Sequence, residues 1–363
     1  MFMLIISIVG MAMTGILFYH FPRLPRFYDN TEDLPGVSVI IPARNEAKNL
    51  PLILEDLKQQ TISLVDIICV DDSSNDDTAA VALAHGAFVI ALKEKPAQWM
   101  GKSWACQCGA AQAKGELLLF IDADVRLGHQ AIEALVRQQM VRQAVISVQP
   151  YHHTRRFYEQ LSLFFNLVLI GANGAALPQQ RAIGLFGPII LMERRVYWQI
   201  GGHASVRHCI AEDVSLGDIL KAGNIPFQLF IGNPDIRFRM YAGGIGDLIH
   251  GWTKNMATGA SKTPIFRGMM VFCWVSSLIA VPMALYNFLA AGQLGFVSLF
   301  LTLYILWIVL LKGLSKEIGD FRFWSILLYP IPLLAFLMIF MVSFIKKIFG
   351  LQVHWKGRSM GTR

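Results

Sequence analysis

Four long apolar stretches without charged residues set the first limit on how this chain of 363 residues can fold. They cover residues 2–19, 268–291, 294–311 and 323–344. Each is close to the length of about 20 residues that a helix needs to cross the hydrocarbon core of a bilayer. Only 16% of the residues are charged, against about a quarter in ordinary soluble domains. These features indicate a membrane protein.

The first apolar stretch could instead be a secretory signal peptide. It lacks a preceding basic region and a small-residue cleavage site, which favours a retained anchor over residues 1–20. We expect further membrane segments within residues 267–345 and a basic tail at 346–363. Four complete crossings would place both termini outside, whereas the basic tail favours the cytoplasm. Either one segment is re-entrant, such as the one containing Pro330 and Pro332, or the first does not cross.

The part between the first and second apolar stretches has about 245 residues, enough for one sizeable core. Basic residues lie at both of its ends: Arg23, Arg26, Lys254, Lys262 and Arg267. This distribution predicts a multi-pass protein of the cell membrane with this part in the cytoplasm. The formal net charge of +7 favours attraction to an anionic inner leaflet. The sequence has no arginine-rich stripe with interleaved aromatic residues, so we expect no nucleic acid partner.

Strand and helix patterns alternate through residues 34–240, which predicts an α/β fold with a mainly parallel sheet. The expected strands are residues 37–41, 65–70, 87–92 and 117–121, and the expected helices are residues 47–60, 78–85 and 103–113. The pattern at residues 151–191 is vaguer. There we expect mixed helix and loop that touches the membrane through residues 157–174.

Three of the expected strands end in polar clusters, which read "PARNE", "DDSSNDDT" and "DADV". In open α/β sheets, ligands bind beyond the carboxyl ends of the strands. We therefore expect these clusters to meet at one edge of the sheet and to form a site.

The aspartates of "LLLFIDADV", Asp122 and Asp124, directly follow a buried strand. In an extended backbone, residues two apart point to the same side, about 6.6–7 Å from each other. Two such carboxylates fit a hard cation, Mg²⁺ or Mn²⁺, shared with substrate phosphates. A solvated acidic turn is the plain alternative.

Two classes of enzyme acting on phosphate compounds fit an aspartate pair in this position. The segment "FIDADV" resembles the nucleophile motif of haloacid-dehalogenase-type phosphatases. Those enzymes require a further acidic cluster later in the chain, whereas "VDDSSNDD" comes before. A membrane-tethered phosphatase is therefore the weaker alternative.

The other class is the glycosyltransferases that use nucleotide sugars. The ordered series "VSVIIPARNE", "VDDSSNDDT", "AKGELLLFIDADV", "RRVYWQIGG" and "AEDVSLG" resembles family 2 glycosyltransferases of the GT-A (nucleotide-diphospho-sugar transferase) fold, over about residues 36–240. The segments "WMGKSWACQCGAA", "RMYAGG" and "WKGR" resemble the membrane-bound carotenoid branch of that family. Ceramide-type glucosyltransferases are a more distant likeness. The resemblance implies a GT-A domain with transmembrane helices at both ends.

The resemblance also implies roles in binding a UDP-sugar donor. Four residues after the first strand would line the nucleoside pocket: Pro42, Ala43, Arg44 and Glu46. Asp72, or alternatively Asp71, would bind the uracil or ribose, and Lys102 would neutralise phosphate charge. Asp76 and Asp77 are expected to cap the following helix instead. The plain alternatives are a helix N-terminal acid for Glu46 and a surface lysine for Lys102.

Further implied roles concern the reaction itself. Asp122 and Asp124 would anchor the Mg²⁺ or Mn²⁺ diphosphate unit, with Asp124 the more direct ligand and Ala123 beside the donor. Three other residues complete the site: Asp213 as general base, Glu212 positioning it, and Arg239 contacting the diphosphate. Attack from the face opposite UDP would invert the anomeric configuration. The alternative for the Glu-Asp pair is a simple helix start.

The acceptor is inferred from the membrane-proximal part of the chain. Residues 241–266 mix apolar positions with Trp252, Lys254 and Lys262, which predicts an interfacial helix, or alternatively a buried one. The Q-x-x-R-W motif of processive synthases is absent, which favours transfer of a single sugar. We therefore expect transfer of one hexose, glucose from UDP-glucose, to a lipid acceptor such as a carotenoid or terpenoid. Ceramide or diacylglycerol, and an inactive binding protein of this fold, are alternatives.

Overall fold

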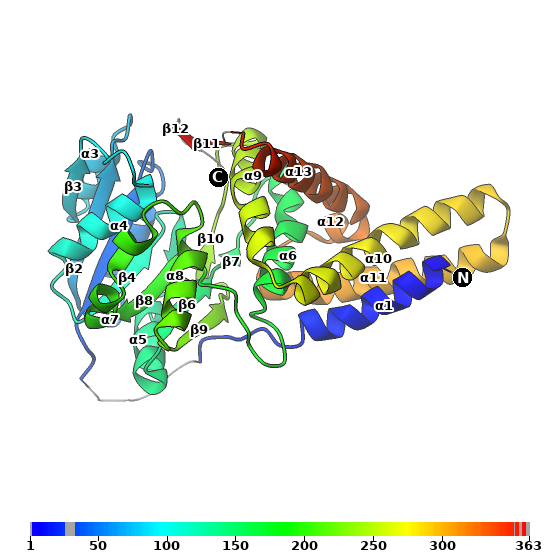
Figure 1. The fold of residues 1–363 in the computed structure, drawn as a ribbon, viewed down its shortest axis with the longest axis horizontal. Coiled ribbons are helices and arrows are strands. Elements are labelled where there is room, and N and C mark those ends of the chain that lie inside the picture. The colour runs from blue at the N-terminus through cyan, green and yellow to red at the C-terminus, as the bar shows by residue number, and fades with distance from the viewer. Residues whose placement is uncertain (1, 26–32, 352, 356–357, 361–363) are drawn as a thin grey trace.

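A computed structural model describes residues 2–25, 33–351, 353–355 and 358–360. One part contains a seven-stranded sheet, and a bundle of long helices extends from its side (Figure 1). The strand order across this sheet is β3-β2-β1-β4-β8-β6-β9. Its strands are β1 (Val37–Ala43), β2 (Leu64–Asp72), β3 (Phe88–Leu92), β4 (Leu117–Ile121), β6 (Val145–Gln149), β8 (Ile189–Glu193) and β9 (Phe227–Ile231).

The central strands β1, β4 and β6 are buried along almost their whole length because both faces of the sheet are covered. Every residue of β4 and β6 is buried, as continuous runs in parallel sheets require. Strand β1 pairs in parallel with both β2 and β4, while β8 runs antiparallel between β4 and β6. The mainly parallel sheet predicted from the sequence is confirmed, with β8 as its antiparallel member.

Helices cover both faces of the sheet, and successive side chains of β1 point alternately to one helix layer and the other. Ile40 faces α4, whereas Ile41 belongs to the core packed under α2 and α5. Helix α4 lies close to the sheet at Gly109, where a Cβ would be 2.5 Å from Cγ2 of Ile40. The helices of this part are α2 (Leu50–Lys58), α3 (Thr78–Ala84), α4 (Gly101–Gln112), α5 (Ala131–Arg142), α7 (Arg194–Gln199) and α8 (Glu212–Ala222), with a 3₁₀ turn, η2 (Gly202–Val206).

A second, three-stranded sheet has the order β5-β10-β7. Strand β10 pairs antiparallel with β5 and parallel with β7, so the segment after the aspartate pair lies beside Arg237 and Phe238. Its strands are β5 (Val125–Leu127), β7 (Tyr151–His152) and β10 (Ile236–Phe238), and a short hairpin is formed by β11 (Val353–Trp355) and β12 (Arg358–Met360).

The helical bundle contains three helices of the described chain that are long and apolar enough to cross a membrane: α10 (Ile265–Ala290), α11 (Leu294–Ile318) and α13 (Pro330–Ile348). Pro330 occupies the first turn of α13, where its missing N–H is not needed. The apolar stretch expected at residues 323–344 is thus divided at Pro330, because a short helix, α12 (Phe323–Leu327), ends before this proline and α13 begins at it.

The N-terminal helix α1 (Phe2–Leu17) has 16 residues, short for a complete crossing. It lies along α10 (Figure 1), and the indole of Trp274 donates a hydrogen bond of 3.1 Å to Oγ1 of Thr14. Gly10 allows this approach, because a Cβ there would overlap the Ser277 side chain. The expected anchor is thus a short helix packed on a longer one.

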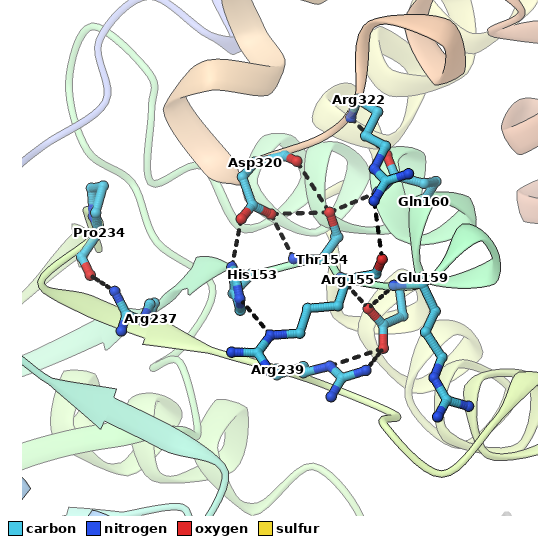
Figure 2. Close-up of polar contacts among 11 residues, drawn as sticks. His153, Thr154, Arg155, Glu159, Gln160, Pro234, Arg237, Arg239, Asp320 and Arg322 are labelled. Atoms are coloured by element: carbon cyan, nitrogen blue, oxygen red, sulfur yellow. Dashed lines mark hydrogen bonds and ion pairs between the residues drawn. The ribbon is translucent and has the colours of Figure 1, made fainter. Parts of the chain in front are cut away.

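The bundle is tied to the sheets by ion pairs and hydrogen bonds. The Arg23 guanidinium lies 2.6 Å from Glu317 at the end of α11 and also donates to the carbonyl of Gly232. Asp320, just after α11, accepts hydrogen bonds of 2.5 Å from His153 and from the Thr154 backbone (Figure 2). The end of α11 is thereby fixed against the strand β7 region. Arg26 and part of the basic tail lie outside the described residues.

Residues 151–191 and 241–266 supply elements that lie at the junction of sheet and bundle: η1 (Phe157–Ser162), α6 (Leu163–Asn173) and α9 (Ile245–Lys262). Helix α6 packs against α10, α11 and α13. Its side chains are largely buried in protein, whereas Phe157 of η1 is exposed. Contact of residues 157–174 with the membrane stays a prediction.

Candidate active site

A cavity of about 1640 Å³ opens beyond the carboxyl ends of β1, β2 and β4 and continues between the junction and bundle helices. All twelve residues predicted for the site line it: Pro42, Ala43, Arg44, Glu46, Asp72, Lys102, Asp122, Ala123, Asp124, Glu212, Asp213 and Arg239. The sheet topology explains this convergence, because parallel strands bring their polar ends to one edge.

The end of β1 contacts the end of β2 through Arg44. Its Nη1 donates to the carbonyls of Asp72, at 2.5 Å, and Ser73, at 2.9 Å. The carboxylate of Glu46 accepts a 2.7 Å hydrogen bond from Asn49, just before helix α2. The predicted nucleoside-binding segment is therefore held in place by its own neighbours.

The two aspartates at the end of β2, Asp71 and Asp72, point to different surroundings. Asp71 turns into its own loop and accepts a 3.1 Å hydrogen bond from the backbone of Ser74, whereas Asp72 lines the cavity. Of the two alternatives left open by the sequence, the geometry favours Asp72. Asp76 accepts from the Thr78 backbone at 3.1 Å and caps α3, whereas the Asp77 side chain makes no capping hydrogen bond.

The aspartate pair lies in a turn and not in extended backbone, so the geometry predicted for it is wrong. The backbone N–H of Val125 donates to the carbonyl of Asp122 at 3.2 Å, which closes a four-residue β-turn. Ala123 is buried, while Asp122 and Asp124 are each partly exposed to the cavity. The turn still brings both carboxylates to one site.

Lys102 is the cationic centre of the acidic cluster. Its Nζ lies 2.7 Å from Oδ1 of Asp122 and 3.5 Å from Oε1 of Glu212, and it donates to the carbonyl of Gly187 at 3.2 Å. Burial alone would lower the pKa of Lys102, but the two carboxylates raise it above its ordinary range. The amine is therefore charged, and it is not the plain surface lysine of the alternative interpretation.

Glu212 and Asp213 form the first turn of α8 and face the same cavity. Burial, reinforced by Glu212, raises the pKa of Asp213 to about 6, against the opposing effect of Lys102. Gly187 makes room for this carboxylate, since a Cβ there would lie 2.8 Å from Oδ2 of Asp213. The pair does start a helix, and the raised pKa of Asp213 is compatible with the general-base role predicted for it.

Arg239 lines the cavity, but Glu159 holds its guanidinium. Its Nε and Nη2 donate to Oε1 of the buried Glu159 at 3.0 and 2.7 Å (Figure 2). Contact between Arg239 and a diphosphate remains a prediction.

The fit to a divalent cation rests on the aspartate turn. The described residues contain no group of three His, Cys, Asp or Glu side chains placed to hold a metal ion. Asp122 and Asp124 can offer two oxygen ligands, and Asp122 already faces the ammonium of Lys102. The donor set suits Mg²⁺ or Mn²⁺ with the remaining ligands supplied by substrate and water.

The other half of the cavity is apolar and was not predicted as part of the site. Its walls come from α6, α9, α10 and α13, through residues that include Leu169, Met256, Phe272, Ile279, Phe336 and Phe340. The charge-free segments were the only sequence feature that pointed to this apolar half. Their sequence does not show which side of each helix faces the cavity.

Helix α9 lines the cavity with both charged and apolar residues, among them Lys254 and Met256. Trp252, predicted at the membrane interface, is 1% exposed and stacks on Phe165 with ring centroids 4.7 Å apart. Its indole also donates to Oγ of Ser162 at 3.2 Å. The buried-helix alternative holds at this residue. Two residues further along, Lys254 lies in the cavity wall, a site residue that sequence reasoning missed.

Comparison with known proteins identifies the family. Residues 38–201 match the model of glycosyl transferase family 2. The 4,4'-diaponeurosporenoate glycosyltransferase of Staphylococcus aureus is 35% identical over 330 residues, covering 89% of this chain and 88% of that protein. The Staphylococcus haemolyticus enzyme of the same name is 34% identical over 380 residues, with 97% and 96% covered.

A solved structure supports the fold. A mannosyltransferase from Pyrobaculum calidifontis, in complex with GDP-Man and Mn²⁺, superposes with a TM-score of 0.53 at 16% identity, covering 94% of this chain and 99% of that one. The fold predicted from the sequence is confirmed, and the comparisons give no support to the phosphatase alternative. The chain therefore belongs to family 2 of the glycosyltransferases, and the protein is an enzyme of that class.

Proposed function

We propose that this enzyme transfers one hexose, glucose from UDP-glucose, to a membrane lipid acceptor, a carotenoid or related terpenoid. One observation carries the proposal: a single cavity joins the charged cluster at the strand ends to the apolar walls of α10 and α13. A charged donor and an apolar acceptor can meet only where two such environments are continuous.

The donor half has the features of a nucleotide diphosphate site. Arg44 and Asp72 lie at the ends of β1 and β2, where a nucleoside would bind, and Lys102 lies next to Asp122. A sugar diphosphate carries concentrated negative charge, which the ammonium of Lys102 would neutralise through charge-assisted hydrogen bonds. We assign the nucleoside to the first pair and the diphosphate to the Lys102 side.

We assign a divalent cation, Mg²⁺ or Mn²⁺, to Asp124 and Asp122. When bound, the ion would neutralise the leaving diphosphate. The Mn²⁺ in the solved mannosyltransferase supports a divalent cation, although at 16% identity that structure establishes only the fold. Lys102 would keep the acidic turn folded until donor and ion bind together.

Asp213 acts on the acceptor side of the reaction centre. With a hydroxyl acceptor it takes the proton as the oxygen attacks the anomeric carbon, and with an ionised acceptor it orients the nucleophile. In both cases its negative charge stabilises the positive charge that develops on the sugar ring. Glu212 positions it, and attack opposite the departing UDP inverts the configuration.

The acceptor class follows from the apolar half of the cavity and from the relatives, which are named for 4,4'-diaponeurosporenoate. With α10, α11 and α13 crossing the membrane and the sheet part in the cytoplasm, an acceptor could reach Asp213 without leaving the bilayer. A ceramide or diacylglycerol acceptor would use the same route.

The test uses membranes that contain the full chain. They are incubated with labelled UDP-glucose, Mg²⁺ or Mn²⁺, and an extract of carotenoid-containing lipids, and label is counted in the organic phase. We expect label only with the metal and none with the Asp213→Asn variant. Transfer from another nucleotide sugar alone would overturn the donor assignment, and label on ceramide or diacylglycerol alone would overturn the acceptor assignment.

A further inference from the structure

Lys254 lies in the cavity wall where the charged and apolar halves meet. It is part of α9, whose earlier residues His250 and Gly251 and later residues Met256 and Gly259 also line the cavity. The roles assigned to the donor, the cation and the base do not use this lysine.

Packing on both sides fixes the position of this turn of α9. Trp252 is stacked on Phe165 of α6, with ring centroids 4.7 Å apart. On the bundle side, Oγ of Ser343 in α13 donates a 2.6 Å hydrogen bond to the carbonyl of Thr253. This turn of α9 is therefore held against α6 and α13, two of the helices that form the apolar half.

The surroundings of Lys254 are strongly charged. Burial lowers the pKa of Lys254, whereas the carboxylates of Glu212, Asp213 and Asp122 raise it and Lys102 lowers it further. Lys102 is already engaged at 2.7 Å by Asp122 and at 3.5 Å by Glu212. Lys254 thus adds a second basic group to the acidic cluster, on a helix that also contributes the apolar Met256 to the cavity wall.

This placement has a consequence for the acceptor's reactive end. A neutral hydroxyl could approach Asp213 without electrostatic cost, whereas a carboxylate would be repelled by both Glu212 and Asp213. A cation beside those two residues offsets the repulsion and can hold the incoming oxygen by a charge-assisted hydrogen bond.

We propose that Lys254 binds the carboxylate of a lipid acid and makes the enzyme select the acid over the matching alcohol. This inference rests on the proposed transfer to a membrane lipid. One carboxylate oxygen forms a bond to the anomeric carbon while the bond from that carbon to the diphosphate oxygen breaks. UDP leaves with the electron pair, no proton is removed, and the product is a glycosyl ester.

The experiment compares two acceptors with the same chain: 4,4'-diaponeurosporenoic acid and the alcohol formed by reducing it. The full-length protein in detergent is assayed with labelled UDP-glucose, and the ratio of kcat/KM for acid to kcat/KM for alcohol is measured. We expect Lys254→Met to lower this ratio about tenfold or more, as loss of a charged hydrogen bond implies. Lys254→Arg should retain most of the ratio.

The matched control is Lys262→Met on the same helix, where the lysine lies 2.8 Å from Asp218. It should keep the wild-type ratio. An unchanged ratio in Lys254→Met, or equal losses for acid and alcohol, would overturn the assignment of Lys254. A wild-type enzyme that glycosylates neither lipid would instead overturn the proposed acceptor class, so the two failures are distinguishable.

Discussion

Replacing Lys102 by methionine tests the charged half of the cavity. The substitution keeps most of the side-chain volume and removes the ammonium that lies 2.7 Å from Asp122 and 3.5 Å from Glu212. Three consequences are expected: a less stable fold, weaker donor binding and a shift in the pH dependence of transfer.

The stability change can be sized from the geometry. At an effective dielectric constant of about 20, unit charges about 3 Å apart attract by about 5 kcal/mol before desolvation is counted. The side chains of Lys102 and Asp122 are 33% and 29% exposed, so solvent screening reduces the net effect. We expect the free energy of unfolding to fall by about 2 kcal/mol.

The kinetic effect of Lys102→Met is expected mainly in the KM for the donor. Loss of a charged contact to the diphosphate costs about 1.5–3 kcal/mol, which raises the KM for UDP-glucose about 10- to 150-fold. With Asp213 as the proposed base, activity should fall as the pH drops through about 6, where this carboxylate becomes protonated. Because Lys102 lowers the pKa of Asp213, Lys102→Met should move this acid limb to higher pH.

The assay combines thermal unfolding of the purified full chain with initial rates at varied UDP-glucose and pH. Lys114→Met is the control, because this exposed lysine just beyond α4 uses only its backbone to contact Asp66. A Lys102→Met enzyme with an unchanged donor KM and an unchanged acid limb would refute the reasoning, even if its melting temperature fell.

Three further predictions concern other parts of the site. Asp213→Asn should lower kcat by about 10²–10⁴-fold with an unchanged circular dichroism spectrum, and near-normal turnover would remove it from the reaction. Chelation of divalent cations should abolish transfer and added Mn²⁺ restore it, while Asp124→Asn should raise the Mn²⁺ concentration needed for half-maximal rate; turnover that survives chelation would contradict the metal assignment. Trp252→Ala should reduce the free energy of unfolding by about 3–5 kcal/mol and Trp252→Phe by less, measured by thermal unfolding, and equal losses would argue against the packing account.

The strand ends could be predicted because local sequence determines them. The runs that became β1, β2 and β4 are mainly apolar where buried, and a polar cluster lies at the end of each. Once the sheet is taken as parallel, those clusters must share an edge. The meeting of Arg44, Asp72 and Asp122 in one cavity was therefore predictable without coordinates.

Contacts between distant segments could not be predicted in the same way. The hydrogen bond from Lys102 to the carbonyl of Gly187 joins residues 85 apart in sequence. It depends on the entry of β8 antiparallel to β4, for which the residue pattern gave no direction. The inward face of α9, and with it the position of Lys254, likewise depends on packing against α6 and α13.

The prediction was also limited where one stretch of sequence is compatible with two backbone conformations. An apolar run followed by Asp122 and Asp124 is compatible with a continued strand or a turn, and the hydrogen bond between Val125 and Asp122 decides for the turn. Pro330 is compatible with a break or a helix start, and the structure has both, because α12 ends before it and α13 begins at it.

The central claim is that one sugar passes from a nucleotide to a lipid within this cavity. The most direct measurement incubates purified full-length protein with UDP-glucose, Mn²⁺ and 4,4'-diaponeurosporenoic acid in vesicles, and analyses the lipid product by mass spectrometry and NMR. The account predicts a mass increase of one hexose and a β linkage from the α-linked donor. Free glucose without lipid product, several added hexoses or a retained α linkage would contradict it.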